Sequence, residues 1–101
     1  MNWYKRKKIA DSAHNLYEYL CHHPVKLKEE DIFNSEVDVP PGFHVDQVSP
    51  GRWAGFAPEE ADNVMLVAPE PTREHAKTLM KRRVYYILLD LAGDSECRVA
   101  V

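Results

Sequence analysis

The most regular pattern of apolar positions lies between Thr72 and Gly93, where apolar residues recur at three- and four-residue steps. That spacing predicts one long helix with a single apolar face. Pro71 disfavours an earlier start, and Thr72 can accept the free N–H groups of the first turn. Gly93 can end the helix in the left-handed cap conformation. The predicted apolar face consists of Ala76, Met80, Val84, Ile87, Leu88 and Leu91.

The two halves of this predicted helix differ in polarity. Residues 73–83 are amphipathic, and we expect their lysines and arginines to face solvent, whereas between residues 84 and 91 only Asp90 is charged. A helix that is apolar nearly all round must be covered nearly all round. We therefore expect the N-terminal helix or a second copy of the chain to pack on its far side. A structural homodimer of that kind would be sealed by Tyr85, Tyr86 and Leu89.

The first part of the chain predicts a second, shorter helix. Four consecutive cations at residues 5–8 oppose the helix dipole, so regular helix is expected only from Ile9. Apolar residues at helical spacing continue from there to Leu20, and Pro24 provides the stop. Residues 28–33 are expected to form a short helical turn within the connection that follows.

Between the two helices the pattern changes to that of strands. We expect strands at residues 43–48, 52–57 and 64–68, the first two joined by a tight turn that contains Pro50 and Gly51. The third strand is continuously apolar, which is typical of a central or doubly covered position.

These elements predict a single α+β domain over residues 1–101, in the order α-β-β-β-α. Its three-stranded antiparallel sheet would be covered on one face by the N-terminal helix and the long C-terminal helix. Residues 96–101 could add a short C-terminal edge strand.

The net charge of −3 conceals a segregation of charge along the chain. Residues 26–71 hold ten of the sixteen acidic residues but three of the thirteen basic ones. Most of these acids fall in predicted loops, which lie on the surface, and an acidic surface attracts basic partners. The alternative is that the charge serves solubility alone. The candidate partner-binding acids are Glu29, Glu30, Asp31, Glu59, Glu60 and Asp62.

Trp53 is a further candidate for partner binding. If Ala54 and Phe56 face the helices, alternation along the strand sends Trp53 to the open face, beside His44 and Asp46. An exposed tryptophan among charged residues is typical of an interaction hot spot. The opposite alternation would place Trp53 in the core.

The sequence contains no recognised motif for catalysis, metal binding or a cofactor. His22 and His23 are adjacent and point about 100° apart on a helix, so they are poorly placed to share one ion. No nucleophile motif and no phosphate-binding glycine loop is present, so we expect neither an enzyme nor a cofactor. Cys21 and Cys97 are expected to be free thiols of a cytoplasmic protein that does not enter a membrane.

The order helix, three strands, helix resembles the double-stranded-RNA-binding domain over residues 43–92. That family has a basic cluster at the start of its last helix, although Glu74 and His75 stand here where the family has consecutive lysines. The resemblance implies, as one alternative, binding of nucleic acid through a basic helix face. The residues of that face are Arg73, Lys77, Lys81, Arg82 and Arg83.

The leading hypothesis is a non-enzymatic, acidic protein-binding module that docks on a basic partner. In its sharpest form the chain is a small inhibitor of a nucleic-acid-handling complex, occupying a basic groove in place of DNA or RNA. In size and charge the chain is similar to anti-CRISPR and other phage-encoded anti-defence proteins. The expected partner is therefore a protein with a basic surface, and the chain itself would be a monomer or a homodimer.

Overall fold

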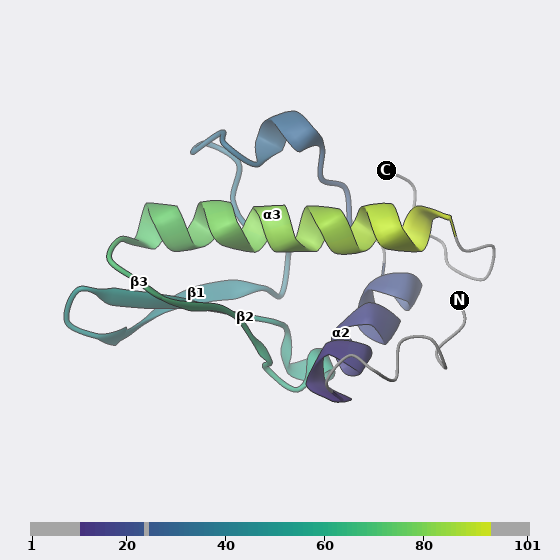
Figure 1. The fold of residues 1–101 in the computed structure, drawn as a ribbon, viewed down its shortest axis with the longest axis horizontal. Helices are drawn as coiled ribbons and strands as arrows, with labels where there is room; N and C mark the ends of the chain where they lie inside the picture. The colour runs from purple at the N-terminus through teal and green to yellow at the C-terminus, as the bar shows by residue number, and fades with distance from the viewer. Residues whose placement is uncertain (1–10, 24, 94–101) are drawn as a thin grey trace.

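The computed structural model describes residues 11–23 and 25–93, which form the layered arrangement of Figure 1. The α+β class and the order α-β-β-β-α are confirmed. The segment 1–8 and the predicted edge strand at 96–101 lie outside the described residues. The elements are helices α2 (Asp11–His22) and α3 (Arg73–Ala92), the 3-10 turns η1 (Glu29–Asp31) and η2 (Glu59–Ala61), and strands β1 (His44–Ser49), β2 (Arg52–Phe56) and β3 (Met65–Glu70).

The three strands form an antiparallel sheet in the order β1-β2-β3. The turn between β1 and β2 uses Gly51 at φ +69°, a conformation that favours glycine. The expectation of a central or doubly covered third strand is wrong, because the strands pair in chain order, β2 takes the centre, and Met65 and Ala68 are exposed. As an edge strand, β3 leaves the Met65 side chain 52% exposed.

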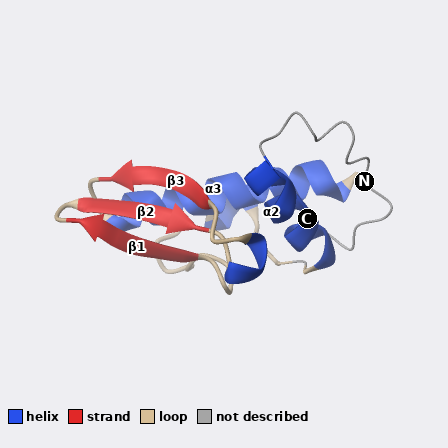
Figure 2. Cartoon of the chain, turned by 90° about the horizontal axis from the view of Figure 1, so that it is seen from below, coloured by secondary structure: helices blue, strands red, loops and turns tan. Residues whose placement is uncertain are grey.

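Helix α3 crosses one face of the sheet, and Figure 2 shows the strands in front of it. The residues Val45, Gly55 and Val67 are paired across the three strands. A Cβ added at Gly55 would lie 2.6 Å from the Met80 Cε, so this row faces α3 and the missing side chain permits close packing. The buried hydrophobic core between sheet and helices includes Leu16, Leu20, Phe43, Val67, Ala76, Met80, Val84, Leu88 and Leu91.

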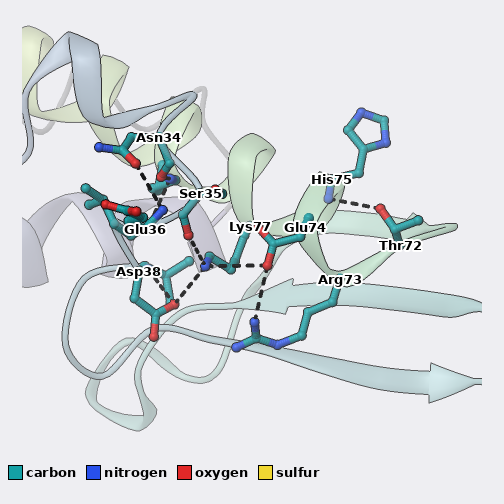
Figure 3. Close-up of polar contacts among 12 residues, drawn as sticks. Asn34, Ser35, Glu36, Asp38, Thr72, Arg73, Glu74, His75 and Lys77 are labelled. Atoms are coloured by element: carbon teal, nitrogen blue, oxygen red, sulfur yellow. Dashed lines mark hydrogen bonds and ion pairs between the residues drawn. The ribbon is translucent and has the colours of Figure 1, made fainter.

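Both ends of α3 are at the predicted residues. The Thr72 Oγ1 accepts a hydrogen bond of 3.1 Å from the His75 backbone N–H, as drawn in Figure 3. Gly93 follows the last helical residue, but its φ is −83°, so the left-handed cap that we expected is not formed. Helix α2 packs against η2 and α3 at one end of the sheet (Figure 1).

Candidate functional site

The structure separates the predicted partner-binding acids into two groups. The acids of η1 are Glu29, Glu30 and Asp31, and η1 lies on the side of α3 opposite the sheet (Figure 1). The turn η2 and its cap supply Glu59, Glu60 and Asp62, and η2 lies next to α2. Because α3 stands between them, these residues do not share one acidic surface.

The second acidic group is held by the hydrogen bonds of the η2 turn. The backbone N–H groups of Ala61 and Asn63 donate to the Pro58 carbonyl at 2.9 and 3.1 Å. Ala61 is fully buried, whereas Glu59 and Glu60 are exposed. The turn therefore anchors its apolar residue in the core and presents both carboxylates to solvent.

Asp62 connects this turn to helix α2. Its backbone is left-handed, with φ at 60°, and it forms the C-cap of η2. Its carboxylate accepts a hydrogen bond from the Asn15 side-chain amide. Asp62 thus has a structural role in addition to its charge.

A hollow of about 330 Å³ lies beside η2. One of its walls is the stacked pair of Tyr19 and His23, whose ring centroids are 4.4 Å apart at an interplanar angle of 13°. Carboxylates of Glu18 and Glu60 line the same hollow, so it combines negative charge with an aromatic surface. We call the hollow together with the exposed carboxylates of η2 the α2–η2 acidic face. The hollow is lined by Asn15, Glu18, Tyr19, His22, His23 and Glu60.

Trp53 does not lie on the open face of the sheet, the position that its predicted role in partner binding requires. It is half-buried and packs against the hydrophobic core. Gly55, two residues along β2, faces α3, and strand alternation places Trp53 on that same side. The open face carries instead His44, which stacks on Phe56 at 5.4 Å and whose Nδ1 lies 2.6 Å from the Asp46 carboxylate.

The expectation that Lys81 faces solvent is wrong. Its side chain is 1% exposed, and its Nζ donates hydrogen bonds of 2.8, 2.7 and 2.9 Å to the carbonyls of Asp31, Asn34 and Val37. An ammonium group has three protons, so this carbonyl cage satisfies all of them. Removal from water, followed by the positive charge of Lys77, lowers the pKa of Lys81, while nearby carboxylates act in the opposite direction.

Lys77 is buried in the same way, at 6% exposure. Figure 3 shows its ammonium group between the Ser35 carbonyl, the acceptor at 3.1 Å, and the carboxylates of Asp38 and Glu74 at 3.9 and 3.7 Å. The two lysines together fasten the loop that carries η1 onto α3. Their ammonium groups bind to the loop that carries η1 and are not available to phosphate groups.

The predicted nucleic-acid face is therefore incomplete. The cations of α3 that remain exposed are Arg73, Arg82 and Arg83. Arg73 lies 3.8 Å from the Glu74 carboxylate and is nine residues from Arg82, a separation of about 14 Å along the helix. The continuous basic cluster that the resemblance to the double-stranded-RNA-binding domain implied is not present on α3.

A second hollow, of about 270 Å³, lies between η1 and α3. The Tyr85 and Tyr86 rings meet edge to face at 5.9 Å, and the Arg82 guanidinium lies 5.8 Å from the Tyr86 ring centroid. Two of the three residues predicted as a dimer seam, Tyr86 and Leu89, are exposed, whereas Tyr85 is partly buried. We call this hollow the η1–α3 groove; its lining residues are Glu29, Ile32, Phe33, Arg82, Tyr85 and Tyr86.

The expectation of free thiols is wrong for Cys21. It is 4% exposed and disulfide-bonded, while Cys97 lies outside the described residues. Disulfides persist mainly in oxidising compartments, so the cysteines no longer support a cytoplasmic location. That location stays a prediction.

Within residues 11–23 and 25–93, no group of three or more His, Cys, Asp or Glu side chains is arranged to hold a metal ion. Neither of the α-helices in these ranges is long and apolar enough to cross a bilayer.

No family model matches this chain, and no curated protein and no solved structure does so either. The candidate sites are consequently defined by geometry and charge. The burial of the two lysines could have been predicted from their spacing in the sequence, although their charge suggested exposure. Lys77 and Lys81 are four residues apart and continue at helical spacing to Val84 and Leu88, so they extend the apolar stripe of α3.

Proposed function

We propose that this chain is a non-enzymatic protein-binding module that docks on a basic protein surface through its α2–η2 acidic face. The observation that carries the proposal is the pair of exposed carboxylates on η2 beside a hollow of about 330 Å³. No described cation lies within ion-pair distance of Glu59 or Glu60. Their charge is therefore directed outward.

The composition of the hollow fits a basic side chain. Carboxylates form charge-assisted hydrogen bonds with arginine and lysine, and an aromatic ring attracts a cation placed over its face. Glu60 supplies the carboxylate, and the stacked rings of Tyr19 and His23 form an aromatic wall of the same hollow. We expect an arginine or lysine of the partner to enter it.

Rigidity of the η2 turn supports tight docking. The hydrogen bonds of Ala61 and Asp62 to the preceding backbone, each 2.9 Å long, hold Glu59 and Glu60 at defined positions before any partner arrives. A surface that is already ordered loses less conformational entropy on binding. Opposite charge also steers the partner during its approach.

The finer form of this proposal identifies the basic partner as a protein that handles nucleic acid. Such proteins present basic grooves to phosphate groups, and the exposed carboxylates of Glu59 and Glu60 are attracted to the same kind of groove. The chain would then act as an inhibitor, in the manner of anti-CRISPR and other phage-encoded anti-defence proteins, to which it is similar in size and charge.

The test uses two double variants that change the net charge by the same amount. Glu59→Lys/Glu60→Lys reverses charge on η2, and Glu30→Lys/Glu36→Lys does so in the loop that carries η1 on the other side of α3. Asp62 is left intact because it caps η2 and contacts Asn15. The wild type and both variants are used to capture partners from the native host, and the Kd of a captured protein is then measured by calorimetry at several salt concentrations.

We expect the η2 variant to raise the Kd by at least about tenfold and to flatten its salt dependence, within the range of electrostatic effects on association. The control variant should bind nearly as well as the wild type. Equal binding by all three proteins, or an equal loss in both variants, would refute docking through the α2–η2 face. Competition by DNA or RNA for the captured protein tests the finer form.

A further inference from the structure

The face of α3 that points away from the sheet carries exposed apolar side chains. Tyr86 and Leu89 are 55% and 44% exposed, and Phe33, from the loop after η1, is 79% exposed. Phe33 and Tyr86 line the same groove, and monomeric proteins rarely expose large contiguous apolar patches. Ile32 is buried at 4% beneath them, so the exposed residues stand on a packed base rather than on a loose loop.

The loop that carries Phe33 is held in place by the carbonyl cage around Lys81. That ammonium group bonds to Asp31 and Asn34, which lie on either side of Phe33 in the sequence. Phe33 is thus presented at a defined position next to Tyr86 in the η1–α3 groove. A pre-ordered aromatic residue of this kind is a suitable anchor for a protein interface.

The groove carries one acid and one base. Glu29 and Arg82 both line it, and neither has an ion-pair partner among the described residues. A two-fold interface brings the same patch of two copies together, so such a patch must be complementary to itself. A groove with both signs of charge around an aromatic centre meets this requirement.

We infer that the η1–α3 groove is the contact surface for a second copy of this chain. Arg82 of each copy pairs with Glu29 of the other, and the two Phe33 rings enter the facing grooves. A basic partner of the kind proposed for the α2–η2 acidic face fits less well here, because Arg82 and the adjacent, exposed Arg83 would repel it. The inference does not depend on the proposed function, since it uses a different surface.

Charge exchange tests the pairing of Arg82 with Glu29. In Arg82→Glu, two acids face each other across the interface, and in Glu29→Arg, two bases do so. Each single variant should weaken self-association by about tenfold or more, while the double variant Arg82→Glu/Glu29→Arg restores it, because opposite charges meet again. Mass is measured by sedimentation and light scattering over a wide range of protein concentration, with circular dichroism as the check of folding.

Apolar contacts are tested with a matched pair of exposed residues. Phe33→Ala should raise the dimer Kd by at least about tenfold, the effect of losing a hot-spot anchor. Met65→Ala, at the exposed edge of the sheet, should leave the Kd unchanged. The variant Glu59→Lys/Glu60→Lys should also dimerise normally, which separates this result from the test of the α2–η2 face.

Several outcomes would overturn the inference. A wild type that stays monomeric at every concentration excludes a second copy as the occupant of the groove. A dimer that persists in Phe33→Ala and in both single charge variants uses another surface. Failure of the double variant to recover self-association excludes the pairing of Arg82 with Glu29, and binding of a foreign protein that requires Phe33 would assign the groove to that protein instead.

Discussion

In both halves of helix α3 the burial of some side chains is the opposite of what their polarity predicts. In the first half, the lysine side chains of Lys77 and Lys81 are buried beneath the loop that carries η1. In the second half, the apolar side chains of Tyr86 and Leu89 are exposed. The difference shows that a side chain of this helix is buried where another segment of the chain packs over it, whatever its polarity. Even an ammonium group can be buried when three backbone carbonyls accept its hydrogen bonds.

The largest expected effect concerns two adjacent leucines on α3. Leu88 is fully buried and Leu89 is 44% exposed. We expect Leu88→Ala to lower the free energy of unfolding by about 2–5 kcal/mol, since it leaves a cavity in the core. Leu89→Ala should change it by less than about 0.5 kcal/mol at concentrations where the chain is monomeric. Urea denaturation measures both, and similar losses in the two variants would mean that the second half is covered on both sides.

An intermediate effect is expected for the buried lysine. Lys81→Met leaves the carbonyls of Asp31, Asn34 and Val37 without their donor. Each unsatisfied buried group costs about 1–3 kcal/mol, and partial access of water reduces the total, so we expect a loss of about 3 kcal/mol in the free energy of unfolding.

The control for this variant is Arg83→Met, which removes an exposed cation two residues further along α3. It should lie within about 0.5 kcal/mol of the wild type in the same urea experiment. Equal stability of Lys81→Met and Arg83→Met would show that the carbonyl cage contributes little. Hydrogen exchange of the amides in residues 28–37 should increase in Lys81→Met alone.

The smallest effect is the dependence on pH. Burial and the charge of Lys77 lower the pKa of Lys81 from its usual 10.5, so the folded chain releases this proton at a lower pH than the unfolded chain. Between the two pKa values the unfolded state binds more protons, and the contribution of Lys81 to the free energy of unfolding therefore rises with pH.

Urea unfolding of the wild type and Lys81→Met, followed from neutral pH towards 10.5, isolates this contribution as the difference between the two curves. We expect the free energy of unfolding of the wild type to rise relative to that of Lys81→Met as the pH rises. A shift in the opposite direction would mean that the three carbonyls outweigh desolvation and raise the pKa of Lys81.

Local signals in the sequence predicted much of the fold. Thr72 as a cap, Gly51 in the hairpin turn and the apolar spacing of α3 each depend on residues close together in the chain. Strand alternation left both orientations of Trp53 open, because it gives two faces of the sheet without indicating which one meets the helix. Gly55 decides that choice, since a position without a side chain allows Met80 to approach.

The amino-acid sequence by itself determined the secondary structure, the order of its elements and the surplus of acid in the middle of the chain, because these follow from propensity and from composition. Only the tertiary structure decided which charges reach solvent. It divided the acids between η1 and η2 on different sides of α3 and enclosed Lys77 and Lys81 under a loop some forty residues earlier in the chain. The physical reason is that desolvation and hydrogen bonding of a charge depend on the groups around it in space, and those groups are distant in the sequence.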